Sequence, residues 1–159
     1  MRSEGGDAAL RELADRLELE RLVVRYAYAI DERAFERLDD IFTPDAYIDY
    51  RAMGGIDGGY AQIRAWLPQA LGVFPACMHF NGNFLFEIDG DRASGKVACF
   101  NPMVLPKADG APGEGDTMFL GLWYLDRYVR TAAGWRIRER IEKRSYDFNM
   151  PAAFRQAMQ

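Results

Sequence analysis

A single histidine, His79, and the aspartate Asp31 are the side chains of this sequence best suited to acid–base chemistry. Imidazole titrates near neutral pH, and a carboxylate bound to one ring nitrogen fixes its tautomer, so the two together form a candidate general base. The residues that alternate with His79 along its predicted strand are the compact polar side chains of Cys77, Asn81 and Asn83. They fit the lining of a polar cavity and an open surface equally well, so the sequence leaves both environments open for the histidine.

Two structural roles remain open for Asp31. Leu10, Leu17 and Val24 recur every seven residues, and Asp31 is the next position of that series. This spacing predicts that its carboxylate projects close to the apolar face of the first helix, toward the interior. Aspartate is also a favoured N-cap residue, so its carboxylate could instead bind backbone N–H groups at the start of the following helix.

The hydrophobic pattern predicts an α+β fold, in which a curved antiparallel sheet wraps around N-terminal helices. Helical spacing indicates helices over residues 8–30, 34–41 and 60–72, with a short strand at 46–50 and a glycine-rich loop at 53–59. Four further strands and a short helix are expected over residues 77–89, 93–105, 117–130, 135–146 and 151–158, with a polar loop at 106–116. Alternation along the first of these strands puts an apolar set on the face opposite His79, namely Met78, Phe80, Phe84, Phe86 and Ile88.

The composition bounds the class of protein. The chain has 159 residues, is 49% hydrophobic and carries a net charge of -4, which predicts one domain over residues 1–159 and argues against nucleic-acid or anionic-membrane partners. The charged N-terminal segment and the lack of a long apolar window predict neither a signal peptide nor a membrane span. We therefore expect a cytoplasmic protein in which Cys77 and Cys99 are buried, reduced thiols.

Other candidate chemistry is weaker. Cys77 and His79 alone leave a metal site short of its usual three or four ligands, so no metal is expected. No glycine-rich phosphate loop and no Gly-x-Ser-x-Gly motif occurs, so the sequence supports neither a nucleotide cofactor nor serine hydrolysis, and no cofactor is expected. Arg136, Arg138 and Arg140 share one strand parity, which is typical of a solvated arginine face.

The chain also resembles a known family. The stretches LERLVVRYAYAIDERAFERLDDIFTPDAYIDY, MHFNGNFLFEIDGDRASGKV and LDRYVRTAAGWRIRERIEKRSYDF are similar to SnoaL-like proteins of the nuclear transport factor 2-like superfamily, across residues 13–148. Among these, the likeness is greatest to scytalone dehydratase, bile acid dehydratases and hexachlorocyclohexane dehydrochlorinase. The resemblance implies a cone-shaped, cystatin-like fold, which hosts many different functions.

The resemblance also implies roles for individual residues. His79 matches the histidine that removes the substrate proton in these lyases, and Asp31 matches the aspartate that orients it. Tyr50 matches a tyrosine near the substrate carbonyl in scytalone dehydratase, and Tyr26 falls where bile acid dehydratases and ketosteroid isomerase place an active-site tyrosine. Arg140 matches the leaving-group arginine of the dehydrochlorinase, although its strand parity requires an intervening bulge.

The sequence departs from scytalone dehydratase at three positions. Asn101 stands in place of a second histidine, and Leu122 and Tyr124 replace a serine and an asparagine of the pocket. Scytalone is therefore not the expected substrate. The position of the catalytic base of ketosteroid isomerase falls near Tyr50, so the machinery of that isomerase is not retained.

We predict a cofactor-independent lyase, a dehydratase in which Tyr26 and Tyr50 bind the enolate-like oxygen or the departing hydroxyl. An isomerase or cyclase with the same dyad, or a non-catalytic binding or assembly subunit, remains as an alternative. Aromatic and methionine side chains predict a hydrophobic or cyclic, polyketide-, steroid- or terpenoid-like substrate, with contacts expected from Met53, Trp66, Phe100, Asn101, Met103, Tyr124 and Arg140.

A homo-oligomer is expected, most simply a two-fold dimer. Residues 117–129 are apolar on both strand parities, whereas the predicted helices cover only one face of the sheet. Either the Phe119/Trp123/Leu125 set or the Leu120/Leu122/Tyr124 set would then be exposed on a monomer as a large apolar patch.

Overall fold

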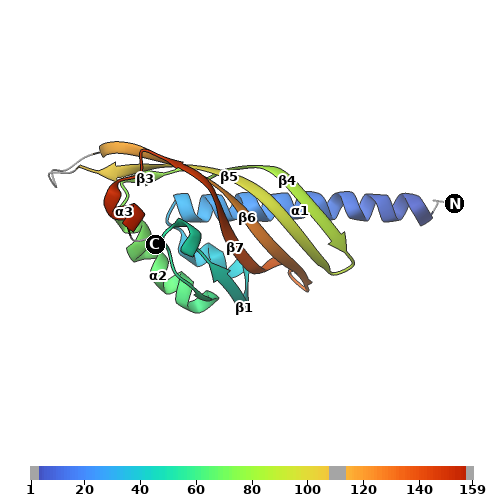
Figure 1. Ribbon diagram of the computed structural model, residues 1–159. Coiled ribbons are helices and arrows are strands. Elements are labelled where there is room, and N and C mark those ends of the chain that lie inside the picture. Colours follow the sequence, from blue (N-terminus) through green and yellow to red (C-terminus); the bar gives the residue numbers. More distant parts are fainter. Residues whose placement is uncertain (1–3, 108–113, 157–159) are drawn as a thin grey trace.

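A computed structural model describes residues 4–107 and 114–156. Its elements are, in chain order, α1 (Glu4–Asp31), the 3₁₀ helix η1 (Phe35–Asp40), β1 (Phe42–Asp49), the 3₁₀ helix η2 (Arg51–Met53), β2 (Asp57–Gly59), α2 (Tyr60–Gly72), β3 (Ala76–Cys77), β4 (Phe80–Asp89), β5 (Arg92–Pro106), β6 (Glu114–Thr131), β7 (Gly134–Phe148) and α3 (Ala152–Gln156). The predicted α+β class is confirmed, with one curved sheet and helices gathered on its inner side (Figure 1).

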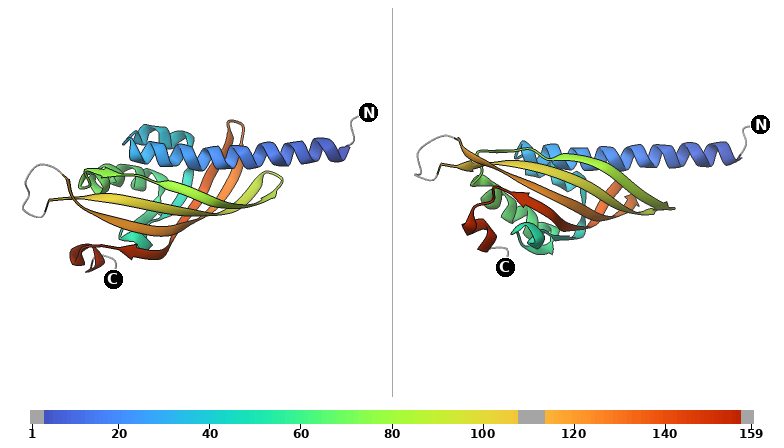
Figure 2. Two further views of the ribbon diagram at one scale, coloured as in Figure 1. Left: turned by 90° about the horizontal axis from the view of Figure 1, so that it is seen from above. Right: turned by 45° about the horizontal axis from the view of Figure 1, so that its top comes forward.

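The sheet contains seven strands in the order β2-β1-β7-β6-β5-β3, with β4 also paired to β5. Strands β4 to β7 form the predicted antiparallel meander, and β1 joins β7 in parallel. The inner face of the sheet, which carries Val97, Leu122, Tyr124 and Ile137, packs on Leu19, Leu22 and Val23 of α1. The sheet curls around α1, and α2 and α3 close one end of the curl (Figures 1 and 2).

The buried face of α1 differs from the predicted stripe. Leu10, Leu17 and Val24 are 62%, 47% and 40% exposed, so the seven-residue series does not mark the interior. The buried side chains are instead spaced by three and four residues, at Leu19, Leu22, Val23, Tyr26 and Ile30. The first turns of α1 extend past the end of the sheet (Figure 2), and Leu10 lies in this segment.

A β-bulge in β4 changes which residues face inward. Asn83 and Phe84 lie opposite the single residue Val97 of β5, because the register shifts between Gly82 and Leu85. Asn83 has a φ of 49°, the left-handed conformation common where a strand is bent. Phe86 therefore points inward, whereas Met78 and Phe80, the predicted companions of its face, are 62% and 69% exposed.

A second bulge lies in β7. Ile137 pairs with Tyr128 and Glu139 with Arg127, which leaves Arg138 as the extra residue. The bulge reverses the strand parity, so Trp135 and Ile137 face inward before it and Arg140 after it. Arg136, Arg138 and Arg140 therefore do not form one solvated face, because Arg140 is fully buried.

Several predicted boundaries shift. The expected helix at 34–41 is a six-residue 3₁₀ helix, and the strand expected at 46–50 begins at Phe42. Pro44 lies where the pairing of β1 with β7 is irregular, as expected for a residue that cannot donate to the ladder. Strand β5 reaches Pro106 and β6 begins at Glu114, so the central part of the predicted loop (108–113) and the end of the predicted C-terminal helix (157–158) lie outside the described residues.

The outer face of the sheet is rich in aromatic side chains. Phe80, Phe148 and Phe100 are 69%, 65% and 39% exposed, and the Phe100 ring stacks on Phe119 with 5.7 Å between centroids. The Leu120/Leu122/Tyr124 set is buried on the inner face, so the outer set is the one left uncovered in the chain.

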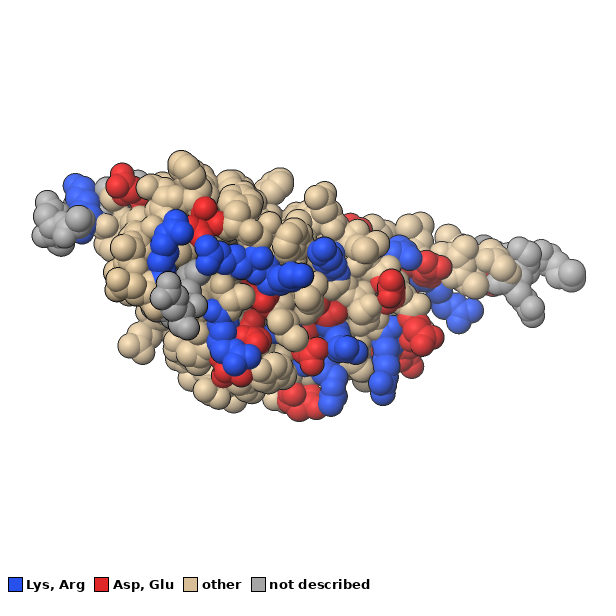
Figure 3. Space-filling view, viewed as in Figure 1, with Lys and Arg blue, Asp and Glu red and all other residues tan. Residues whose placement is uncertain are grey.

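Charged side chains occupy the surface near β1 and β7. Figure 3 shows Lys and Arg interspersed with Asp and Glu over the lower part of one face, and ion pairs such as Arg138–Asp45 and Arg127–Glu139 account for this mixture. Over the described ranges, no helix combines the length and the apolar character needed to cross a membrane.

Candidate functional site

The end of α1 positions Asp31. The backbone N–H of Ala34 donates to the carbonyl of Ala29, and that of Arg33 donates to the carbonyl of Ile30, the two bonds of a Schellman motif. Arg33 takes the left-handed conformation (φ 60°) that glycine usually occupies there. The chain therefore turns sharply directly after Asp31, and this residue stays on the last turn of the helix.

The Arg33 side chain accounts for the choice of arginine over glycine. Its guanidinium donates to the carbonyl of Ile30 at 2.9 Å, to Sγ of Cys77 at 3.1 Å and to the carbonyl of Leu71 at 3.2 Å. It thereby ties together the ends of α1 and α2 and the strand β3. These contacts hold the segment that carries His79 against the carboxylate of Asp31.

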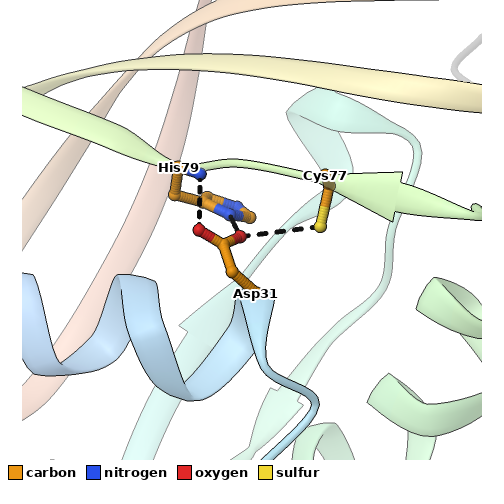
Figure 4. A group of neighbouring side chains, drawn as sticks. All are labelled: Asp31, Cys77 and His79. Carbon is orange, nitrogen blue, oxygen red and sulfur yellow. Dashed lines mark hydrogen bonds and ion pairs between the residues drawn. The ribbon is translucent and has the colours of Figure 1, made fainter.

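Asp31 and His79 form a direct hydrogen bond. Nδ1 of His79 lies 2.6 Å from Oδ1 of Asp31, and the backbone N–H of His79 donates to Oδ2 at 2.8 Å (Figure 4). Partial burial of Asp31 acts to raise its pKa, but the hydrogen bonds from His79 outweigh that effect and lower the pKa. The carboxylate is therefore ionised at neutral pH and serves as an acceptor, rather than as the N-cap of η1, which has no side-chain cap.

The contacts of His79 define its tautomer. A nitrogen facing a carboxylate must carry the proton, so Nδ1–H donates to Asp31 and Nε2 is left with its lone pair in the neutral ring. The amide nitrogen of Asn101 lies 3.1 Å from Nε2 and donates to it. With 7% of its side chain exposed, His79 presents a basic nitrogen to an enclosed space and not to open solvent.

Two buried tyrosines stand beside the histidine. The hydroxyls of Tyr26 and Tyr50 lie 2.7 Å apart, and the Tyr26 ring packs edge-on against His79. Burial raises the pKa of Tyr26 to about 12 and the pKa of Tyr50 well above its ordinary value. Both hydroxyls are therefore protonated, and the one that accepts from the other keeps its own proton for a further partner.

These side chains meet at a cavity of about 430 Å³. Its wall includes seven of the predicted site residues, namely Tyr26, Tyr50, Met53, Trp66, His79, Asn101 and Met103. Three others do not line it: Asp31 is behind His79, and Tyr124 and Arg140 belong to the layer beneath Tyr26. Phe100 lies on the outer face, because its strand parity is opposite to that of Asn101.

Arg140 is a buried supporting residue. Its Nε and Nη2 donate to the two carboxylate oxygens of Asp126 at 2.8 and 2.6 Å, and both side chains are 0% exposed. The guanidinium stacks between the rings of Tyr26 and Tyr124, 4.1 and 4.0 Å from their centroids. The predicted contact of Arg140 with a leaving group needs correction, because the Tyr26 ring lies between it and the cavity.

The sequence matches a family that fits this geometry. Residues 11–141 match the SnoaL-like domain. The chain belongs to the SnoaL-like family. An uncharacterised protein of Mycobacterium tuberculosis strain H37Rv, Rv2910c, is 52% identical to it over 138 residues, which cover 87% of this chain and 90% of the relative.

Solved structures share the SnoaL-like fold of this protein. A putative scytalone dehydratase from Novosphingobium aromaticivorans superimposes with a TM-score of 0.76 at 18% identity, covering 89% of this chain and 91% of that one. Hexachlorocyclohexane dehydrochlorinase type 3 from Novosphingobium barchaimii gives 0.73 at 17% identity, covering 91% and 95%. An NTF2-like protein with a cystatin-like fold from N. aromaticivorans gives 0.64 at 27% identity, covering 100% and 99%.

Glu142 is a cavity residue of this SnoaL-like protein that sequence reasoning missed. It lies on β7 and lines the cavity, and its Oε2 is buried with no hydrogen-bond partner within residues 4–107 and 114–156. Burial raises its pKa to about 8, with Arg140 opposing the shift. Strict alternation from Trp135 predicts that Glu142 points outward. The resemblance of Arg140 to a pocket arginine was the available signal, because Glu142 lies two residues later and therefore on the same face as Arg140.

Asp31 and His79 lie close to Cys77. Within the described ranges, these three residues are the one group of His, Cys, Asp or Glu side chains compact enough to hold a metal ion. Burial raises the pKa of the Cys77 thiol, so it is protonated and a poor ligand at neutral pH. The Arg33 guanidinium beside its Sγ opposes a cation. The donor set of this SnoaL-like protein therefore suits a hydrogen-bonded dyad better than a metal centre.

Both cysteines are free thiols. Cys77 is partly buried and Cys99 is buried.

Proposed function

We propose that this protein is a cofactor-independent lyase, a dehydratase that removes a proton next to a carbonyl group and expels a β-hydroxyl. One observation carries the proposal: the His79 ring is fixed by Asp31 through Nδ1, and its Nε2 lies at the cavity, where a substrate C–H would replace the Asn101 amide as its partner. The helix dipole disfavours a carboxylate at the C-terminal end of a helix. The presence of Asp31 at this end of α1 is therefore better explained by a functional role than by helix stability. The names of the structural neighbours, a dehydratase and a dehydrochlorinase, support elimination chemistry.

The proposed reaction begins at His79. Nε2 removes the acidic proton, and Asp31 stabilises the imidazolium that forms, a contribution of about 10²–10⁴-fold for a well-placed base. The hydroxyl pair of Tyr26 and Tyr50 donates to the oxygen that gains charge, which is worth roughly 3 kcal/mol for one good donor. Protonated tyrosines suit this role because they can donate without a change of charge.

The cavity supports a compact hydrophobic substrate. Its volume, about 430 Å³, lies within the range of about 300–1,000 Å³ common for small-molecule pockets. Trp66, Met53 and Met103 give it broad apolar walls, with the polar groups gathered at His79, Asn101 and the tyrosine pair. This division fits a cyclic polyketide-, steroid- or terpenoid-like ketone better than a sugar or a charged metabolite.

Proton abstraction can be tested separately from elimination. Purified protein is incubated in D₂O with a panel of cyclic ketones, including tetralone, β-hydroxytetralone and β-hydroxycyclohexanone, and deuterium uptake and water loss are followed by mass spectrometry. We expect deuterium at the α-carbon of tetralone and water loss from a β-hydroxyketone. A shifted double bond in a β,γ-unsaturated member of the panel, without water loss from the hydroxyketones, would identify an isomerase. Binding without exchange on any member would contradict the lyase proposal in favour of a binding subunit.

We also propose that the chain forms a homodimer through the outer face of its sheet. Exposed Phe80, Phe100 and Phe148, next to Phe119 and Trp123, make an apolar surface that a second copy would remove from water. Light scattering at micromolar concentration should give twice the chain mass of 18.1 kDa, and a Phe80→Asp/Phe148→Asp variant should be monomeric. An interface of this kind should bury more than about 1,000 Å² in total. A monomeric wild-type protein would contradict the proposal.

A further inference from the structure

Glu142 is an ionisable group of the cavity that the proposed proton abstraction does not use. It pairs with Tyr124 across β6 and β7 and reaches the same cavity wall as Tyr26 and Tyr50. A buried carboxyl oxygen without a hydrogen bond costs stability, and Oε2 of Glu142 is such an atom among the described residues. A group retained at that cost, with an oxygen free to bind, is suited to contact a ligand.

The position of Glu142 relative to His79 follows from the sheet order. His79 lies between β3 and β4 at one side, and β5 and β6 separate those strands from β7. The sheet is curved (Figure 1), and His79 from the β3–β4 segment and Glu142 from β7 line the same cavity. A substrate in the cavity could therefore contact His79, the tyrosine pair and Glu142 at the same time.

The surroundings of Glu142 keep it protonated over the neutral range. Burial raises its pKa to about 8, Arg140 from the same strand opposes this, and Asp49 and Asp126 add to it. The other titratable groups that interact with it are Tyr26 of α1, Tyr50 directly after β1, Cys99 of β5 and Tyr124 of β6. A neutral carboxyl has an O–H to donate, which a carboxylate does not.

We propose that Glu142 is the general acid of this cavity and protonates the hydroxyl group that leaves the substrate. The inference rests on the proposed function. His79 Nε2 takes the α-proton, the C–H electron pair becomes the new C=C bond, and the C–O bond breaks toward oxygen. The Glu142 carboxyl gives its proton to that oxygen, so water departs. Imidazolium and carboxylate remain, and proton exchange with solvent restores the starting state.

The leaving group provides the test. A hydroxyl needs a proton to depart, whereas chloride does not, so Glu142→Gln should lose elimination from β-hydroxytetralone by about 10²-fold or more. The same variant should retain elimination from β-chlorotetralone and deuterium exchange into tetralone within a few-fold of wild type. The matched control is Glu139→Gln. Glu139 lies on the same strand as Glu142 but pairs with Arg127 at the surface, so this variant should retain all three activities.

The outcomes separate the two proposals. If wild type neither exchanges nor eliminates, the lyase function fails; if Glu142→Gln releases water as fast as wild type, only the role of Glu142 fails. Equal losses on the hydroxy and chloro substrates would also overturn it, because a structural defect would not depend on the leaving group.

A substrate-free measurement accompanies this. In protein labelled with ¹³C at glutamate Cδ, one resonance should titrate near pH 8 in wild type and be missing in Glu142→Gln. Titration of every glutamate near the ordinary value of about 4.3 would contradict a protonated Glu142. The Glu142→Leu variant should unfold at a higher temperature than wild type, as expected when a residue is retained for function at a cost in stability.

Discussion

Replacement of His79 by alanine should lower turnover of any β-hydroxyketone accepted by the wild-type protein by about 10²–10⁴-fold, because it removes the proposed base. His79→Gln should do the same, since an amide can bind Asp31 but cannot take up a proton. Asp31→Asn should cost less than either, because it weakens the orientation and the charge stabilisation of the ring while the base remains. Steady-state rates of water loss measure all three effects.

The control for these variants lies next to the dyad. Glu32 follows Asp31 directly and pairs with Arg37 at the surface, so Glu32→Gln removes a neighbouring carboxylate without touching the site. It should keep wild-type activity, and all four variants should keep the wild-type circular dichroism spectrum. Activity retained in His79→Ala would indicate that the protein is a binding or assembly subunit.

Removal of the Asp126 carboxylate should have the largest effect on stability. Asp126→Ala leaves the fully buried Arg140 guanidinium unpaired, and such a change costs about 3–5 kcal/mol of unfolding free energy. For a chain of this length that corresponds to a melting temperature lower by roughly 6–20 °C. Tyr128 also loses its acceptor, because its hydroxyl donates to Asp126 at 2.7 Å. Denaturant titration gives the free energy directly.

Two further variants show that burial decides this effect. Asp45 pairs with Arg138 in an exposed ion pair, so Asp45→Ala should leave the unfolding midpoint unchanged. The double variant Asp126→Leu/Arg140→Met removes both buried charges and should recover much of the stability lost in Asp126→Ala. If the single and double variants are equally unstable, packing rather than the unpaired charge is the cause.

The fold was predictable because its signals are local. Helical spacing found α2 at residues 60–72, and alternation found the meander of β4 to β7 within a few residues. The inner face of α1 was not found, because the series at Leu10, Leu17 and Val24 competes with the true face around Leu22 and Tyr26. Which face is buried depends on how far the sheet extends along the helix, and a single helix does not encode that extent.

The site was predictable only in part, for a physical reason. His79 was found because it is the single histidine of the chain, and Tyr26 and Tyr50 were found through the resemblance to the family; all three line the cavity. Glu142 was missed because a bulge is one extra residue that leaves no mark in the apolar pattern. A glutamate in the charged run around Arg140 is expected in solvent unless the bulge at Arg138 is known.

The bulge at Arg138 also bears on how relatives should be aligned and redesigned. Successive side chains of a strand point to opposite faces of the sheet. A chain that lacked the extra residue at the bulge would therefore turn Arg140 and Glu142 outward. An alignment gap of one residue at this point therefore exchanges the inward-facing and outward-facing residues of the rest of β7. Homologues that differ in length at this point would need their second half of β7 compared with a shifted numbering before any residue is called equivalent.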